Sequence, residues 1–117
     1  MGQGCRSSGL ITTDQVVFAG RCKLVSIHGA NFALSGSGPA AERIVLKLYD
    51  NATAASGKIV GQMIINSSDT AGGAIGASLE FDMHSVICHN GLYADVDIPS
   101  GSVGTAGLLS GFTVEFA

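Results

Sequence analysis

The chain has 117 residues, of which six are Lys or Arg, nine are Asp or Glu and 17 are Gly. Only 13% of the residues are charged, whereas about a quarter of a typical soluble domain is, and 46% are hydrophobic. No apolar run approaches the ~18 residues that cross a bilayer, and a net charge of -3 with scattered basic residues argues against nucleic acid as a partner. Because a small domain cannot bury this much apolar surface alone, the composition predicts an assembly with another protein, and neither a membrane nor a nucleic-acid partner.

Four segments alternate apolar and polar residues with the period of two that is typical of β-strands. They lie at residues 43–49, 79–84, 92–98 and 112–116. Each is expected to place its apolar face in a core, for example Leu79, Phe81 and Met83 in the second segment. Two further strands, residues 23–27 and 58–65, carry apolar residues on both faces. Such a strand is either central in a sandwich or covered on its outer side by a partner.

Connections rich in Gly, Ser and Asn separate these strands and are predicted to be turns. They lie at residues 34–41, 51–57, 66–78 and 99–110. Seven or eight short strands divided by such turns predict an all-β fold, a single-domain antiparallel β-sandwich or jelly roll over residues 15–117. Residues 1–14 are mostly polar, with little to bury beyond Leu10 and Ile11, and are expected to form a flexible N-terminal arm.

The three cysteines, Cys5, Cys22 and Cys88, form no CxxC motif. Since no apolar signal-peptide segment follows the first residues, buried reduced thiols are expected. Whether Cys22 and Cys88 approach each other stays open. The Asn-x-Ser/Thr sequences at Asn51 and Asn66 are interpreted as turns, because no secretory route is indicated.

His84, Cys88 and His89 lie close enough in the sequence to suggest a metal site. A zinc site needs about four ligands, however, and the strand period puts His89 on the opposite face from the other two. Ordinary strand and turn residues are therefore the preferred interpretation.

Four acids also lie on or near the ends of strands, namely Asp50, Asp82, Asp95 and Asp97. Calcium takes six to eight oxygen ligands, so these acids leave calcium binding open, although a solvated acidic face is favoured. No nucleophile-elbow motif G-x-S-x-G and no phosphate-binding G-x-x-x-x-G-K-[ST] occurs. The sequence thus predicts a protein that is not an enzyme, with no catalytic residue, no cofactor and no assigned metal ligand.

Two motifs carry a resemblance to a known family. Lys47–Asn51 (KLYDN) is followed by Ser56-Gly57 and a returning strand, and Asn90–Val96 (NGLYADV) precedes a closing strand at residues 112–116. Asp50 and Asn51 can cap the first turn, and Asn90-Gly91 is a strong hairpin signal. In this order the segments resemble a group of small virion structural proteins of tailed bacteriophages, over residues 20–117. The long connections at 66–78 and 99–110 depart from the family pattern.

The resemblance implies a capsid decoration (cement) protein at the virion surface, made in the host cytoplasm. Its implied partners are copies of itself, with a trimer as the expected homo-oligomer, and the major capsid protein. Head and tail locations are both open. The alternative is a tail or head-fibre component that binds carbohydrate or a receptor through Tyr49, Tyr93 and the face of Asp95 and Asp97.

Overall fold

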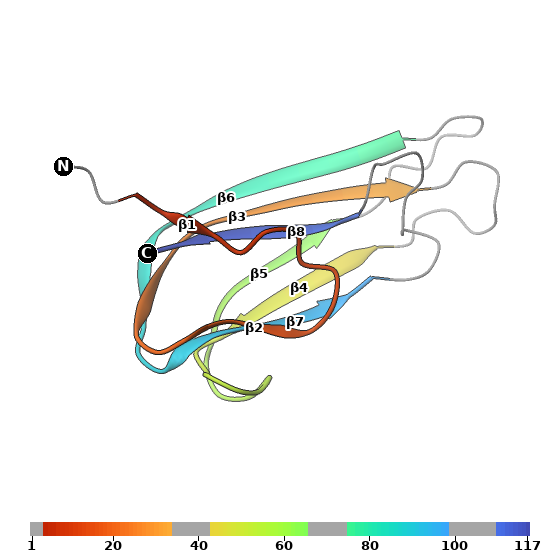
Figure 1. Cartoon of the computed structure of the whole chain (residues 1–117). Helices are drawn as coiled ribbons and strands as arrows, with labels where there is room; N and C mark the ends of the chain where they lie inside the picture. The colour runs from red at the N-terminus through yellow and green to blue at the C-terminus, as the bar shows by residue number, and fades with distance from the viewer. Residues whose placement is uncertain (1–3, 34–42, 66–74, 99–109) are drawn as a thin grey trace.

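The computed structural model describes residues 4–33, 43–65, 75–98 and 110–117, shown in colour in Figure 1. These residues form eight β-strands and no helix, so the described segments contain no helix that could span a membrane. The strands are β1 (Arg6–Ser7), β2 (Gln15–Ala19), β3 (Cys22–Ala33), β4 (Ile44–Tyr49), β5 (Ile59–Ile65), β6 (Ile75–Cys88), β7 (Gly91–Asp97) and β8 (Gly111–Phe116).

The strands pair as nested antiparallel partners: β1 with β8, β2 with β7, β3 with β6, and β4 with β5. Two more pairings, β3 with β8 and β4 with β7, complete two four-stranded sheets. Sheet A has the order β1-β8-β3-β6 and sheet B the order β2-β7-β4-β5, and the two form the layers seen in Figure 1. Nested pairing of eight strands in two sheets is the jelly roll. The predicted all-β antiparallel sandwich of seven or eight strands is confirmed.

The core lies between the two sheets and follows the strand period of two. Side chains from both sheets that are at most 6% exposed fill it: Ile44, Leu46, Leu48, Met63, Ile65, Leu92 and Ala94 from sheet B, and Cys22, Leu24, Ile27, Cys88, Phe112, Val114 and Phe116 from sheet A. The apolar faces predicted for the segments that became β4, β7 and β8 are thus core faces, because each strand turns alternate residues toward the opposite sheet.

One end of the sandwich is a corner at which two neighbouring strands pass together from one sheet to the other. β2 continues into β3 and β6 into β7, and Gly20, with φ +127°, donates its N–H to the Asn90 carbonyl at 3.1 Å. The hairpin expected at Asn90-Gly91 is therefore wrong: β6 and β7 belong to different sheets, so the turn is an intersheet corner. Gly91 is needed there because an added Cβ would lie 2.8 Å from both the Ala52 Cα and the Phe18 carbonyl oxygen.

The two strands expected to be apolar on both faces have different explanations. β3 is central in sheet A, and a bulge between Leu24 and Ser26 turns both Leu24 and Ile27 into the core although they are three residues apart. Across this bulge, His84 and Ser85 of β6 have φ of 52° and 58°. β5 is instead an edge strand of sheet B in the described part of the chain, with Ile64 half exposed on the outer side.

The N-terminal residues 1–14 do not form the flexible arm that was expected, at least from Arg6 to Ile11. Arg6 pairs with Phe116, and Ile11 exchanges backbone hydrogen bonds of 2.6 and 3.0 Å with Phe112. Ile11 is also 0% exposed. Without this segment, the edge of β8 would carry unpaired backbone N–H and C=O groups. The backbone of residues 6–11 supplies partners for them, and this pairing does not depend on the polarity of the side chains.

The predicted turns are only partly within the described residues. At residues 51–57, Asn51 Oδ1 accepts hydrogen bonds from the N–H groups of Thr53 and Ala54 at 2.8 and 3.0 Å, which confirms the turn. The prediction of a connection over residues 66–78 is wrong at its C-terminal end, because residues 75–78 belong to β6, which begins at Ile75. The turns expected at residues 34–41 and 99–110, and the Asn66 site, lie almost wholly outside the described residues.

Candidate functional site

One side of the sandwich carries exposed apolar side chains where core would be expected. In the described part of the chain, β5 and β6 are the edge strands of their sheets on this side, and they contact each other. We call it the open side and define it by Leu79 and Phe81 of β6, which are 41% and 38% exposed. Ile59 and Ile64 of β5 are also exposed, at 44% and 50%, but they lie on the outer face of sheet B with their register partners Tyr49 and Val45.

Leu79 and Phe81 face inward and still reach solvent. Phe81 is the register partner of Ile27, and Leu79 that of Gly29. Directly opposed residues share a face, and Ile27 is fully buried, so both β6 side chains point toward the layer of sheet B. The expectation that they lie in the core is wrong. β6 lies one strand beyond β3, and the described residues place no strand of sheet B beyond β5 to cover it.

The outer face of sheet B carries a row of apolar and aromatic residues across all four strands. Tyr93 is the register partner of both Val16 and Tyr49, and Tyr49 is also paired with Ile59. Val16 is 42% exposed, and both tyrosines are half-buried. The two tyrosines singled out in the sequence are therefore adjacent on one solvent-facing surface.

Beside this row the same face becomes polar. Asp95 is the register partner of Lys47, and Asp97 that of Val45. These four residues line a shallow depression with a volume near 330 Å³. Asp95 and Asp97, two of the four acids expected to face solvent, are on this surface, next to Lys47.

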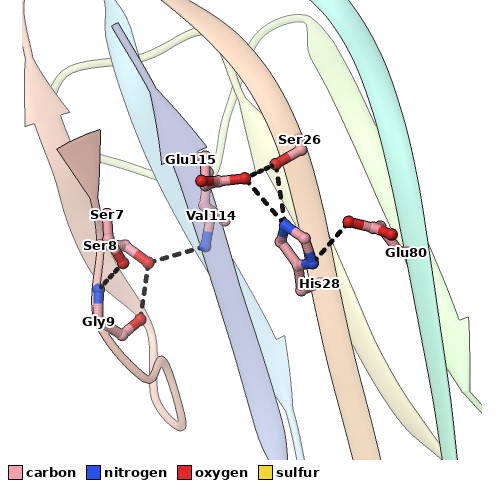
Figure 2. A network of polar contacts seen from close by, with 8 residues as sticks. All are labelled: Ser7, Ser8, Gly9, Ser26, His28, Glu80, Val114 and Glu115. Atoms are coloured by element: carbon pink, nitrogen blue, oxygen red, sulfur yellow. Dashed lines mark hydrogen bonds and ion pairs between the residues drawn. The ribbon is translucent and has the colours of Figure 1, made fainter. Parts of the chain in front are cut away.

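The outer face of sheet A holds a polar cluster centred on His28 (Figure 2). His28 lies between two carboxylates, with Nδ1 3.2 Å from Glu80 Oε2 and Nε2 3.0 Å from Glu115 Oε1. Ser26 Oγ donates to Glu115 and lies 3.0 Å from His28 Nε2. The Ser26 hydrogen bond, followed by that from His28, holds the pKa of Glu115 below its usual value. The cluster links β3, β6 and β8.

A serine, a histidine and an acid in contact also occur in nucleophilic catalysis, but the hydrogen bonds here have a different direction. In a catalytic triad the serine proton goes to the histidine, whereas Ser26 donates to Glu115. Ser26 is also only 8% exposed. We therefore interpret this cluster as a cross-strand link in sheet A. Sequence analysis missed it, although the i, i+2 spacing of Ser26 and His28 places both on one face of a strand.

Asp50 has a structural role at the corner. Its carboxylate accepts backbone N–H groups from His89 at 3.0 Å, Asn90 at 2.7 Å and Gly91 at 3.3 Å. Burial raises the pKa of Asp50, but these donors outweigh it and hold that pKa below its usual value. With three donors on its two oxygens, Asp50 is committed to this turn.

The other residues considered as metal ligands are not brought together. Residues 4–33, 43–65, 75–98 and 110–117 contain no group of three or more His, Cys, Asp or Glu side chains placed to hold a metal ion. Asp82 Oδ1 accepts the His84 N–H at 2.8 Å, Cys88 is buried in the core, and His89 Nδ1 lies 3.4 Å from Arg21 Nη1.

No family model, curated protein or solved structure matches this chain. We therefore infer the function from three surfaces: the open side, the tyrosine row on sheet B and the His28 cluster on sheet A.

Proposed function

We propose that this chain is a non-enzymatic structural protein of a bacteriophage virion, most simply a capsid decoration (cement) protein. It forms a homo-oligomer, a trimer, and binds the major capsid protein on the shell surface. The observation that supports this most is the open side, where Leu79 and Phe81 point inward yet are 41% and 38% exposed. The resemblance of the KLYDN and NGLYADV motifs to phage virion proteins supplies the setting, and jelly rolls are common in viral capsids.

The size of the open side favours a repeated assembly over a simple pair. Each of its two apolar side chains, Leu79 and Phe81, is already more than half covered, so burying the rest contributes about 1 kcal/mol apiece. A total of about 2 kcal/mol falls short of the cost of association, which is about 4–15 kcal/mol. A closed ring of three chains makes three such contacts, and attachment to a shell adds further contacts through multivalency.

The oligomer is tested by measuring the mass of the purified chain in solution by light scattering. A trimer of three 11.8 kDa chains gives about 35 kDa. The double variant Leu79→Ser, Phe81→Ser should release monomers of unchanged circular dichroism. Ile87→Ser is the matched control, since Ile87 lies on the same strand with 43% exposure and pairs with the exposed Lys23 on the outer side. Equal masses for the two variants would contradict a role for the open side.

The shell is tested separately by co-sedimentation with capsids that lack the protein. Binding should saturate at hundreds of copies per particle, and the count in purified virions should agree. A soluble monomer that leaves capsids unbound would overturn the proposal. A count of about a dozen or fewer would place the chain in the tail.

A second candidate function, a carbohydrate- or receptor-binding module of a tail or head fibre, rests on a different observation. Tyr49 and Tyr93 are adjacent on the outer face of sheet B, beside the depression lined in part by Asp95 and Asp97. Aromatic rings and carboxylates are groups that can stack on and hydrogen-bond to a sugar. Binding to a glycan array that is lost in Tyr93→Ala, with oligomer mass unchanged, would favour this function over shell decoration.

A further inference from the structure

Cys22 and Cys88 face each other across the β3–β6 pair. They are direct register partners, although 65 residues separate them in the sequence. Their side chains are 5% and 0% exposed, in that order. Both belong to the core cluster, and each thiol affects the pKa of the other. All three cysteines of the chain are free in the structure, and Cys5 is the exposed one.

The backbone pairing sets a separation that a disulfide can span. Lys23 exchanges backbone hydrogen bonds of 2.8 and 2.9 Å with Ala117, so the peptide groups of its neighbour Cys22 point the other way, toward β6. Cys22 and Cys88 therefore form a hydrogen-bonded pair, for which the Cα atoms of antiparallel strands are about 5.5 Å apart. Disulfides join Cα atoms about 4.4–6.8 Å apart, so side-chain rotation and a small approach of the strands suffice.

We propose that Cys22 and Cys88 are the site of a reversible cross-strand disulfide, formed by exchange with a small disulfide such as glutathione disulfide. One cysteine loses its proton, attacks a sulfur of the oxidant and releases one glutathione thiolate. The other cysteine then loses its proton, attacks the mixed disulfide and releases the second thiolate. The two protein thiols are oxidised, and the oxidant is reduced to two glutathione molecules that take up the two protons.

The surroundings of the pair make this reaction slow and dependent on pH. Burial raises the pKa of Cys22, which the Cys88 thiol partly offsets, and burial also raises the pKa of Cys88 to about 12. Because the thiolate is the reactive form, the rate of closure rises about tenfold per pH unit near neutrality. Directly opposed Cβ atoms are about 4.5–5.5 Å apart, slightly more than a relaxed disulfide prefers, so the bond is also readily reduced.

Closing this bond joins β6 covalently to β3 next to the corner between the sheets. In the described part of the chain, β6 is hydrogen-bonded to β3 alone in its sheet. It is also the strand that carries Leu79 and Phe81 on the open side. The bond therefore strengthens the attachment of β6 to β3, its sheet partner among the described strands.

The test incubates the folded wild-type chain with glutathione disulfide at about pH 8.5, where more thiolate is present. The sample is quenched with acid, alkylated in denaturant and digested without reduction. Mass spectrometry should find a disulfide between the peptides that contain Cys22 and Cys88, with Cys5 alkylated or glutathionylated. The melting temperature should rise by about 5–10 °C, and dithiothreitol should reverse the change.

Two variants serve as controls. Cys5→Ser should behave like wild type, since Cys5 is exposed and outside the pair, whereas Cys22→Ser should show no oxidant-dependent rise in melting temperature. If Cys22→Ser does not fold, the peptide map of the wild-type chain decides the question by itself. Recovery of Cys22 and Cys88 as separately modified peptides, or their linkage chiefly to Cys5, would overturn the proposal.

Discussion

The Asp50 carboxylate accepts a 2.7 Å hydrogen bond from the backbone N–H of Asn90, 40 residues further along the chain. This bond joins the turn after β4 to the corner before β7. These are the two places at which the KLYDN and NGLYADV motifs lie, so the residues that carry the resemblance meet in space. Their evident role is to hold a corner of the scaffold.

We predict that Asp50→Ala lowers the free energy of unfolding by about 1–2 kcal/mol, because three backbone donors lose a charged acceptor that solvent partly screens. Urea denaturation at neutral pH measures the change. Asp97→Ala is the control: Asp97 is exposed at the end of β7 and should change stability by no more than about 0.5 kcal/mol. Equal losses in the two variants would show that the corner does not depend on Asp50.

The stability of the chain should fall in acid, in part through Glu115. The Ser26 and His28 hydrogen bonds lower the pKa of Glu115 from the ordinary 4.5, so the folded state binds its proton less readily than the unfolded state. Its contribution is fully present above about pH 4.5 and is lost as the pH falls through the lowered value. Urea midpoints measured from about pH 6 down to about pH 3 should decline less steeply in Glu115→Gln than in wild type.

Asp50 contributes to this acid loss with the same sign, because its pKa is also lowered. Asp50→Asn should therefore remove a second part of the slope, and the double variant with Glu115→Gln should be the flattest of the four proteins. A wild-type slope retained in Glu115→Gln would mean that the His28 cluster does not stabilise the folded state.

We predict that the N-terminal segment contributes to the stability of the fold. Ile11→Ala is expected to lower the free energy of unfolding by about 2–4 kcal/mol, since Ile11 is fully buried and its removal leaves a cavity. Its neighbour Leu10 is 49% exposed, and Leu10→Ala should cost well under half as much. Chemical denaturation of both variants gives the comparison. Similar small losses would restore the interpretation of residues 1–14 as a free arm.

Gly29 should be intolerant of any side chain. An added Cβ would lie 2.7 Å from Ile65 Cδ1 and 2.9 Å from both Met63 Sδ and Phe112 Cδ1, between the two sheets. Gly29→Ala is therefore expected to destabilise the chain by about 1–3 kcal/mol through overpacking. Gly4→Ala meets nothing within 4 Å and serves as the control in the same thermal or urea melts. A neutral Gly29→Ala would mean that the sheets separate more easily than their packing suggests.

Much of the fold could be predicted because alternation is a local property of the backbone. A strand turns successive side chains to opposite faces, so the patterns at Ile44–Tyr49 and Gly111–Phe116 are enough to identify strands and their core faces. The turn at Asn51 is also local, since its side chain bonds to backbone two and three residues on. β1 and β2 were not predicted, because they become strands by pairing with β8 and β7, which are distant in the sequence.

The sequence by itself determined that this protein is an all-β sandwich with little charge and a surplus of apolar surface. Only the tertiary structure decided where that surplus lies, because exposure depends on which strands end each sheet. Phe81 and Ile27 both occupy inward-facing positions in the period-two patterns of their strands. Ile27 is nevertheless covered by sheet B, whereas Phe81 lies beyond the edge of that sheet. The tertiary structure likewise decided the meeting of Cys22 with Cys88 and of His28 with Glu115, since cross-strand register brings together residues whose spacing in the chain carries no such signal.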